Sequence, residues 1–273
     1  MSIVLAVVLC TVVGALGAVI LVAASKFMAV EEDPRIEQVT GCLAGANCGG
    51  CGYAGCADYA KAIVMDGVPC DKCAPGGPKA AAAIGKIMGA EVSAVAKKAV
   101  VQCQGSKDNC KPSYDYKGIQ SCAAAAALYG GPKDCSFACA GFGDCVKACK
   151  FDAIHINSRG VAEVDREKCV CCMQCAAVCP KKVIVSMPYN VDIVLPCANK
   201  EKGVQAKAHC AISCIGCKLC ERNCPSGAIT VSKNVAVIDY DKCTSCGICV
   251  EKCPRKLIVN IHDTGKVAPV VVA

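Results

Sequence analysis

Two stretches near the C-terminus decide the fold: Cys214-Ile-Gly-Cys217-Lys-Leu-Cys220-Glu-Arg-Asn-Cys224-Pro225, and a run of the same spacing from Cys243 to Pro254. Each run has three cysteines separated by two residues and a fourth cysteine after three more. Three thiolates so spaced can wrap one corner of a cubane, whereas structural zinc usually takes two C-x2-C pairs set well apart. The spacing therefore predicts 4Fe-4S clusters rather than zinc or disulfide bonds.

In paired runs of this bacterial ferredoxin type, the fourth cysteine of each run binds the cluster of the other run. The last part of the chain is therefore predicted to hold two clusters. Their expected ligands are Cys214, Cys217, Cys220 and Cys253 for one (cluster 4), and Cys224, Cys243, Cys246 and Cys249 for the other (cluster 5).

A similar but imperfect pair of runs lies upstream. Cys169, Cys172, Cys175 and Cys179 form a full run before Pro180, with Cys171 as a surplus thiol inside it. In the preceding run Phe142 stands where the second cysteine belongs and Lys150 where the proline belongs, and Cys135 is the nearest substitute ligand. The expected ligands are Cys135, Cys139, Cys145 and Cys179 for cluster 2, and Cys149, Cys169, Cys172 and Cys175 for cluster 3.

Both pairs of runs are joined by segments of two short alternating stretches around a turn, at residues 153–165 and 228–239. This pattern is typical of a β-hairpin, and its recurrence marks an internal repeat. Each hairpin would bring its two cysteine runs together. Since such domains have little apolar core, metal binding supplies much of their folding energy, and the apo form is expected to be largely unfolded.

A third motif precedes these domains. Cys48, Cys51 and Cys56 are spaced C-x2-C-x4-C among glycines, and Cys73 follows just before Pro75-Gly76-Gly77. Glycines let backbone N–H groups turn toward an anionic centre. These four cysteines are predicted to hold cluster 1, with Cys42 and Cys70 as competing ligands.

The N-terminal segment from Ile3 to Ala24 is uncharged and almost wholly apolar. As a helix, its 22 residues would span about 33 Å, enough for a bilayer core. The alternative, a cleaved signal peptide, is disfavoured because no basic residues precede the apolar run. Lys26 and the reducing compartment that clusters need both favour a single-pass anchor with the C-terminal domains on the cytoplasmic side.

The remaining segments are less informative. Residues 78–101 have the spacing of an amphipathic helix, and residues 121–128 that of a short alanine-rich helix. Five clusters use twenty of the 29 cysteines. A sixth cluster could use Cys103, Cys110, Cys122 and either Cys197 or Cys210. The cysteines outside the five sets, which otherwise act as small buried apolar residues, are Cys10, Cys42, Cys70, Cys103, Cys110, Cys122, Cys171, Cys197 and Cys210.

The predicted fold class is α+β: an N-terminal transmembrane helix, a small helical 4Fe-4S domain, and two ferredoxin-like two-cluster domains with short β-hairpins. The expected divisions are 1–26 for the anchor, 27–101 for the single-cluster domain, 102–132 for a connection, 133–188 for the first two-cluster domain, 189–208 for a linker and 209–273 for the second two-cluster domain.

No motif supports substrate turnover by side chains. His155, His209 and His262 are scattered, and neither a dinucleotide fingerprint nor a P-loop is present. The formal charge of +7 would suggest a polyanionic partner. However, an oxidised cluster with its four thiolates adds −2, so five clusters lower the charge to about −3. Nucleic acid is therefore not an expected partner.

The order of these features resembles the B subunit of the Rnf complex, a family in which an apolar N-terminal segment and Glu31-Glu32-Asp33-Pro34 precede the motif from Cys48 to Gly77 and ferredoxin-like domains. The resemblance covers essentially the whole chain. It implies an iron-sulfur subunit of an ion-translocating (Na⁺ or H⁺) ferredoxin:NAD⁺ oxidoreductase in the cytoplasmic membrane of a prokaryote. The implied partners are soluble ferredoxin and the integral membrane and flavin-bearing subunits of the complex.

Within this family assignment, chain order favours the C-terminal clusters as the first acceptors of electrons and the cluster at Cys48–Cys73 as the exit toward the membrane. The alternative interpretation is an anchored polyferredoxin that serves a hydrogenase or another reductase. Iron and sulfide analysis would separate both from a zinc-binding protein.

Overall fold

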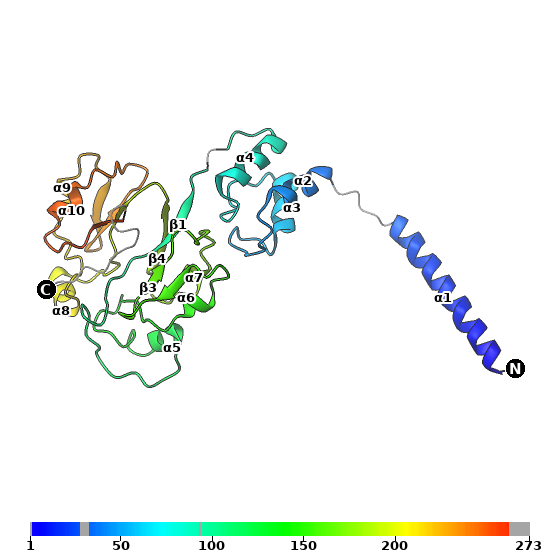
Figure 1. Ribbon diagram of the computed structural model, residues 1–273, viewed down its shortest axis with the longest axis horizontal. Helices are drawn as coiled ribbons and strands as arrows, with labels where there is room; N and C mark the ends of the chain where they lie inside the picture. Colours follow the sequence, from blue (N-terminus) through cyan, green and yellow to red (C-terminus); the bar gives the residue numbers. More distant parts are fainter. Residues whose placement is uncertain (1, 28–32, 93, 262–273) are drawn as a thin grey trace.

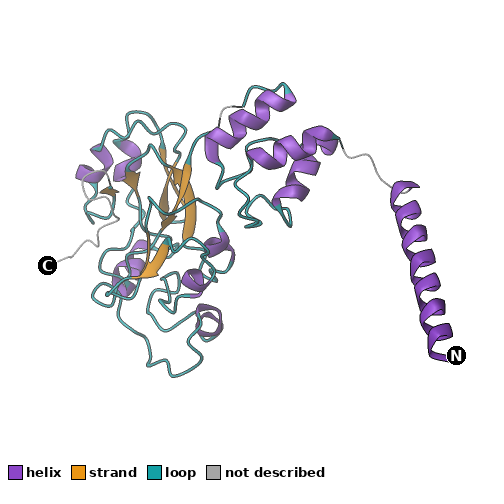
Figure 2. Ribbon diagram, turned by 45° about the vertical axis from the view of Figure 1, so that its right-hand side comes forward, coloured by secondary structure: helices purple, strands orange, loops and turns teal. Residues whose placement is uncertain are grey.

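The computed structural model describes residues 2–27, 33–92 and 94–261 (Figure 1). It is a mixed structure of short helices and two-stranded antiparallel sheets. Figure 2 shows the strands grouped in the centre of a C-terminal body, with one set of helices gathered to the side of it. His262 and the rest of the C-terminal segment lie outside the described residues.

The first helix, α1 (Ser2–Phe27), contains 26 residues and has no acidic residue in its first turn. Its described side chains are apolar and solvent-exposed, for example Leu5 at 67% and Leu21 at 71%. Figure 1 shows α1 standing apart from the other helices. Among the described residues, a search for helices both long enough and apolar enough to cross a membrane finds none.

Three helices then form a small unit: α2 (Pro34–Cys42), α3 (Cys56–Asp66) and α4 (Gly77–Met88). Pro34 occupies the first turn of α2, and the carboxylate of Asp33 accepts a hydrogen bond from Arg35 N at 2.9 Å. The core between the helices is formed by Val39, Tyr59, Ile63 and Ile84. This unit supports the loop that carries Cys48 and Cys51.

The helix predicted over residues 78–101 is wrong in its second half. α4 ends at Met88 because Gly89 adopts a left-handed conformation, with φ of 69°, and its N–H caps the carbonyl of Gly85. The segment Lys97–Val101 forms strand β1 instead, and it pairs with β4 (Ile184–Pro188). A partner 87 residues away along the sequence overrides the local helical spacing.

Both predicted hairpins are confirmed. β2 (Ile154–Ile156) pairs with β3 (Ala162–Val164), and β6 (Ile229–Ser232) pairs with β7 (Val235–Ile238), both antiparallel. A further ladder joins β5 (Ile193–Val194) to β8 (Val259–Asn260). The β1–β4 and β5–β8 ladders are long-range pairings that the hairpin pattern does not predict.

The remaining helices are short. They are α5 (Cys122–Ala127), α6 (Asp144–Lys147), α7 (Gln174–Ala177), α8 (Gly203–His209), α9 (Leu219–Arg222) and α10 (Ile248–Lys252). α5 corresponds to the predicted alanine-rich helix. β1 lies in the range predicted for the single-cluster domain but pairs with β4, which lies in the range predicted for the first two-cluster domain. β5 and most of α8 lie within the predicted linker.

Two apolar cores hold the C-terminal body together. One packs Ala99, Val101, Ile154 and Ile184 around buried cysteines. The other packs Ile193, Ile229, Leu257 and Ile258 in the same manner. In both cores cysteine side chains supply part of the buried surface: Cys139, Cys145, Cys169 and Cys175 in the first, and Cys220 and Cys249 in the second.

Candidate functional site

The cysteine runs have a recurring backbone geometry. In four places a residue with a left-handed conformation precedes a helix of four or five residues, and the second residue of that helix is the third cysteine of a run. The left-handed residues are Gly143, Met173, Lys218 and Gly247, and the cysteines are Cys145, Cys175, Cys220 and Cys249. The variant run therefore keeps the repeat geometry despite Phe142.

Three cavities are each lined by four cysteines. Cys48, Cys51, Cys56 and Cys73 line one. Cys214, Cys217, Cys220 and Cys253 line the second. The volumes of these two, counted with space open to solvent, are about 320 and 370 Å³. Sequence spacing predicts both sets, and neither Cys42 nor Cys70 lines the first cavity.

The third four-cysteine cavity is lined by Cys103, Cys135, Cys197 and Cys210, and its volume is about 320 Å³. Cys103 and Cys197 face each other in an isolated antiparallel bridge. The pKa of the Cys135 thiol is raised to about 12, chiefly by burial and also by the neighbouring Cys103, Cys110 and Cys197. The structure thus brings together four cysteines from distant segments, including one assigned to cluster 2 by sequence.

Cys122 lies near Cys145, one of the cysteines that the sequence groups with Cys135 as ligands of cluster 2. The pKa of Cys145 is raised to about 12, chiefly by burial and also by the nearby thiols of Cys139, Cys122, Cys175 and Cys179. Cys122 opens α5, where the side chain of Asp144, in the first turn of α6, accepts hydrogen bonds from Ser121 Oγ at 2.8 Å and Ala123 N at 3.1 Å. These bonds fasten the start of α5 to the variant run.

The cysteines predicted for cluster 3 also lie close together. Burial raises the pKa of Cys175 to about 12, with Cys169, Cys172 and Cys149 as contributing neighbours. Burial likewise raises the pKa of Cys249 to about 11, with contributions from Cys243, Cys246 and Cys220, of which Cys220 is predicted for the other set. Thiols crowded in this way resist ionising together, so their deprotonation requires a cationic centre among them.

The donor chemistry suits an iron-sulfur cluster better than a single ion. Among the described residues, no three His, Cys, Asp or Glu side chains form a group that could hold one metal ion. The iron corners of a cubane are bound one thiolate each, so a cluster needs four thiols around a hollow rather than in mutual contact. The three four-cysteine cavities provide that arrangement.

Backbone amides point at several of these sulfurs. Cys139 N and Gly105 N donate to Cys103 Sγ at 3.2 and 3.3 Å, and Cys214 N donates to Cys197 Sγ at 3.4 Å. Ala99 N, at the start of the β1 core face, donates to Cys169 Sγ at 3.4 Å. Hydrogen bonds to sulfur stabilise the thiolate form and raise cluster potentials.

Comparison with known proteins agrees with this geometry. Residues 43–75 match the family described as "Putative Fe-S cluster", and residues 213–257 match the family described as "4Fe-4S dicluster domain". The B subunit of the ion-translocating oxidoreductase complex of Methanosarcina acetivorans is 41% identical over 88% of this chain and 91% of its own length. The chain belongs to the family of Rnf B subunits.

The names of two further members of the B-subunit family specify different translocated ions. The B subunit of the Na⁺-translocating ferredoxin:NAD⁺ oxidoreductase complex of Acetobacterium woodii is 41% identical over 89% of this chain and 73% of its own length. The proton-translocating counterpart of Clostridium ljungdahlii is 37% identical over 95% of this chain and 93% of its own length. This Rnf protein is therefore an iron-sulfur electron-transfer subunit.

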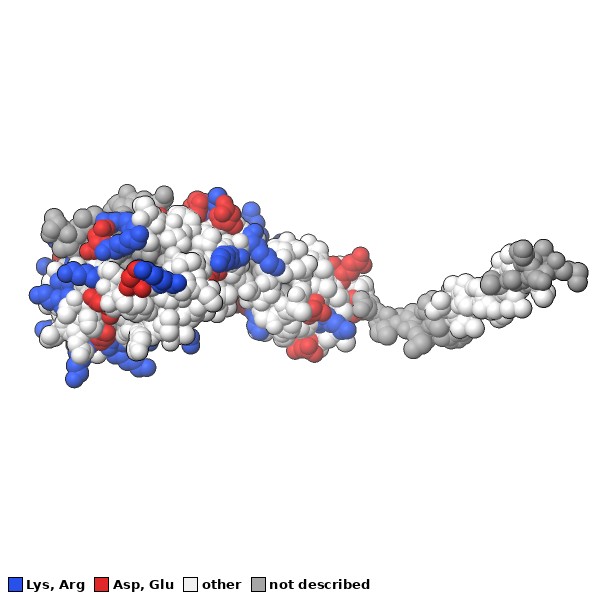
Figure 3. All heavy atoms as spheres, turned by 90° about the horizontal axis from the view of Figure 1, so that it is seen from below, with Lys and Arg blue, Asp and Glu red and all other residues white. Residues whose placement is uncertain are grey.

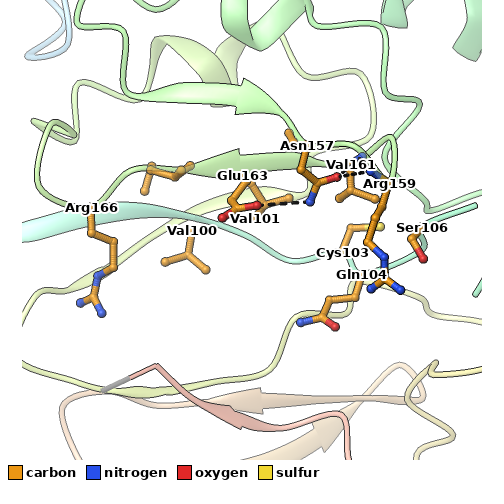
Figure 4. Close-up of a pocket in the computed structure, with 13 residues that line it drawn as sticks. Val100, Val101, Cys103, Gln104, Ser106, Asn157, Arg159, Val161, Glu163 and Arg166 are labelled. Carbon is orange, nitrogen blue, oxygen red and sulfur yellow. Dashed lines mark hydrogen bonds between the residues drawn. The ribbon is translucent and has the colours of Figure 1, made fainter. Parts of the chain in front are cut away.

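Another cavity of this Rnf protein contains a single cysteine, Cys103, in its lining. It lies along β1 and β3 and is lined by polar side chains including Gln104, Asn157, Arg159 and Glu163 (Figure 4). Asn157 Nδ2 donates to Glu163 Oε2 at 3.3 Å, and Arg159 pairs with Asp108 at 3.0 Å. These contacts fix the β2–β3 turn beside Cys103.

Proposed function

We propose that this chain accepts electrons from reduced ferredoxin and passes them to membrane partners of an ion-translocating ferredoxin:NAD⁺ oxidoreductase. The observation that carries the proposal is the convergence of cysteines on three separate cavities within one chain. Iron-sulfur clusters bound at such sites supply one-electron redox chemistry. The names of the Acetobacterium and Clostridium relatives support ferredoxin and NAD⁺ as the substrates of the whole complex.

We propose six ligand sets. Four are those predicted from the sequence as clusters 1, 3, 4 and 5. In cluster 2, Cys122 replaces Cys135, because Cys122 is a close neighbour of Cys145 whereas Cys135 lines another cavity. The revised cluster 2 consists of Cys122, Cys139, Cys145 and Cys179.

The sixth set is Cys103, Cys135, Cys197 and Cys210. It differs from the sequence-based candidate in that Cys197 and Cys210 both take part and Cys110 and Cys122 do not line the cavity. Cys110 does not line the cavity but packs in the same apolar cluster as Cys210, and a hydrogen bond with Cys210 lowers the pKa of Cys110. The set draws on four of the ranges that the sequence predicts. Cys103 lies in the connection, Cys135 in the first two-cluster domain, Cys197 in the linker and Cys210 in the second two-cluster domain.

We also propose that α1 attaches the chain to the membrane that carries the complex. The supporting observations are its length of 26 residues, of which only Lys26 near its end is charged, and the exposure of its large apolar side chains, such as Val19 at 66% and Ile20 at 62%. In Figure 3 the described part of α1 shows no charged residue, whereas acidic and basic side chains are interspersed over the body. Because free thiols and cluster assembly need reducing conditions, we assign the body to the cytoplasmic side.

The decisive experiment uses the full chain, reconstituted with iron and sulfide in detergent. Chemically reduced ferredoxin should be reoxidised by this protein, and the clusters should bleach in proportion. Cys51→Ser should leave this first oxidation intact but stop reduction of the membrane partners, since Cys51 belongs to the set nearest the anchor. Failure of the wild-type chain to oxidise ferredoxin would refute the proposal.

A polyferredoxin that serves a hydrogenase or another reductase would also oxidise ferredoxin. The partner subunits distinguish the two functions. Purification of the tagged chain from native membranes should recover flavin-bearing subunits and ferredoxin-dependent NAD⁺ reduction. Recovery of hydrogenase subunits instead would favour the alternative.

A further inference from the structure

Two cysteine loops that lie far apart in the sequence meet at one small contact. Gln174 Nε2 donates a hydrogen bond to the carbonyl oxygen of Cys48 at 2.9 Å, across 126 residues. Beside it, the backbone of Gly50 lies against that of Cys172, since a Cβ at Gly50 would be 2.8 Å from Cys172 O and 3.1 Å from Cys172 Cα. A side chain at position 50 would therefore clash with the backbone of Cys172.

The contact joins two different ligand sets. Cys48 belongs to the cluster 1 set, and Cys172 to the cluster 3 set. Gln174 opens α7, the helix that also carries Cys175, so its side chain is held rigidly with respect to the second set.

Next to this contact the two parts of the molecule are separated by open space. A cavity of about 1350 Å³, counted with space open to solvent, is lined on one side by Asp71, Cys73 and Pro75 and on the other by Lys98, Cys169 and Met173. One member of each ligand set, Cys73 and Cys169, faces this cavity. The separation of the two sets therefore depends on the narrow contact at its edge.

We propose that Gly50 and Gln174 are positioning residues that hold the Cys48 loop against the Cys172 loop and thereby set the distance between the cluster 1 and cluster 3 sites. This inference rests on the proposed electron-relay function. Gly50 lets the backbones of the two loops touch, and the hydrogen bond from Gln174 to Cys48 stabilises that contact. At this junction one electron leaves the donor site, which is oxidised, and enters the acceptor site, which is reduced, with no bond made or broken.

The glycine is required for space and not for backbone conformation. Gly50 does not have a left-handed φ, in contrast to its neighbours Gly49 and Gly52 with φ of 71° and 91°. An alanine at position 50 is therefore compatible with the local backbone, and its methyl group would push the two loops apart. Gly50→Ala should widen the junction without unfolding either loop.

The test compares two full-chain variants, Gly50→Ala and Gln174→Leu, with two controls from the same small unit or its surface. Gly41→Ala adds a methyl group in α2 where nothing lies within 4 Å, and Gln38→Leu replaces an exposed glutamine of that helix. Iron content per chain is measured first. The readout is the electron paramagnetic resonance spectrum of the fully reduced protein, in which two nearby paramagnetic sites broaden or split each other's signals.

Both junction variants should keep the iron content of the wild type and lose the magnetic interaction between the two sites, whereas both controls should retain it. Electron arrival at cluster 1 after flash reduction should slow in the same variants. An unchanged interaction in both variants would overturn the proposal. If Gly50→Ala loses iron, Gln174→Leu decides, because it removes a hydrogen bond without adding a clash.

The outcome is separable from that of the proposed function. If the wild-type chain fails to oxidise ferredoxin while the junction variants lose the magnetic interaction, the functional proposal is refuted and the positioning role stands. If ferredoxin oxidation is normal and the interaction is unchanged in both variants, the positioning role is refuted and the functional proposal stands.

Discussion

At the scale of the residue, partly buried lysines lie among the cysteine sets. Lys133 Nζ donates to Gly105 O at 2.7 Å and to Gly160 O at 3.3 Å, next to Cys103 and Cys139. Lys181 Nζ donates to the carbonyls of Gly130 and Ser136, and burial lowers its pKa. Because each oxidised cluster with its thiolates carries −2, such cations offset negative charge inside the body.

Replacing Lys133 should lower the reduction potential of the site nearest to it. In Lys133→Met the positive charge that favours the reduced, more negative cluster is lost, and a Coulomb interaction across several ångströms predicts a shift on the order of 50 mV. Redox titration followed by electron paramagnetic resonance measures the shift. Lys61→Met, at an exposed position of α3, is the control and should leave all potentials unchanged.

The exchange of Cys122 and Cys135 between sites is also a residue-scale prediction. Cys122→Ser should abolish the signal of the cluster held by Cys139, Cys145 and Cys179, and iron should fall by about four atoms per chain. Cys135→Ser should remove a different signal, that of the sixth set. Loss of the same signal in both variants would contradict the exchange, and Cys42→Ser should retain full iron content.

At the scale of the element, α1 is separable from the rest. Its described side chains are exposed, and none of the apolar cores includes it. The cluster-bearing body therefore folds without contacts from α1.

A chain lacking residues 1–27 should consequently be soluble without detergent and retain its iron. The full chain should partition into the detergent phase in a phase-separation assay, because burying exposed apolar side chains is worth about 25 cal/mol per Å². Partitioning of both forms into the aqueous phase would argue against membrane attachment through α1.

The β1–β4 ladder is the element that fixes the first cysteine core. Ala99, Val101 and Ile184 from its two strands are buried in that core, and Ala99 N donates to Cys169 Sγ. The ladder thus connects the segment after α4 with the segment after Cys179.

Shortening a buried side chain of the β1–β4 ladder should make the clusters packed against it dissociate under milder denaturing conditions. Ile184→Ala removes a side chain that is 5% exposed, at a cost of about 2 to 4 kcal/mol in the free energy of unfolding. The variant should lose its cluster absorbance at a lower guanidinium concentration than the wild type. Val237→Ala, at a β7 side chain that is 51% exposed, should leave the midpoint nearly unchanged.

At the scale of the whole molecule, charge and folding both depend on the clusters. Each oxidised cluster adds −2, so the six proposed clusters would change the formal charge of +7 to about −5. With all six bound, the protein would be acidic although its sequence is basic. Partly buried lysines such as Lys133 and Lys181 would offset part of this cluster charge.

Removal of iron by acid and chelator should unfold the body. The helices around the cysteine runs are only four or five residues long, too short to persist alone, and thiols fill part of both C-terminal cores. Far-ultraviolet circular dichroism should show loss of structure on chelation, and reconstitution should restore it with about 24 iron atoms per chain. A folded apo body would contradict this dependence.

The sequence by itself determined what is local: the spacing of the full cysteine runs, the two hairpins and the apolar N-terminal segment, because each depends on neighbours a few residues apart. Only the tertiary structure decided which distant segments meet. It ended α4 at Gly89, made residues 97–101 a strand, placed Cys135 in a cavity with Cys103, Cys197 and Cys210, and placed the side chain of Gln174 against the carbonyl oxygen of Cys48. Ligand sets and junctions of this kind are fixed by long-range packing, which spacing along the chain does not encode.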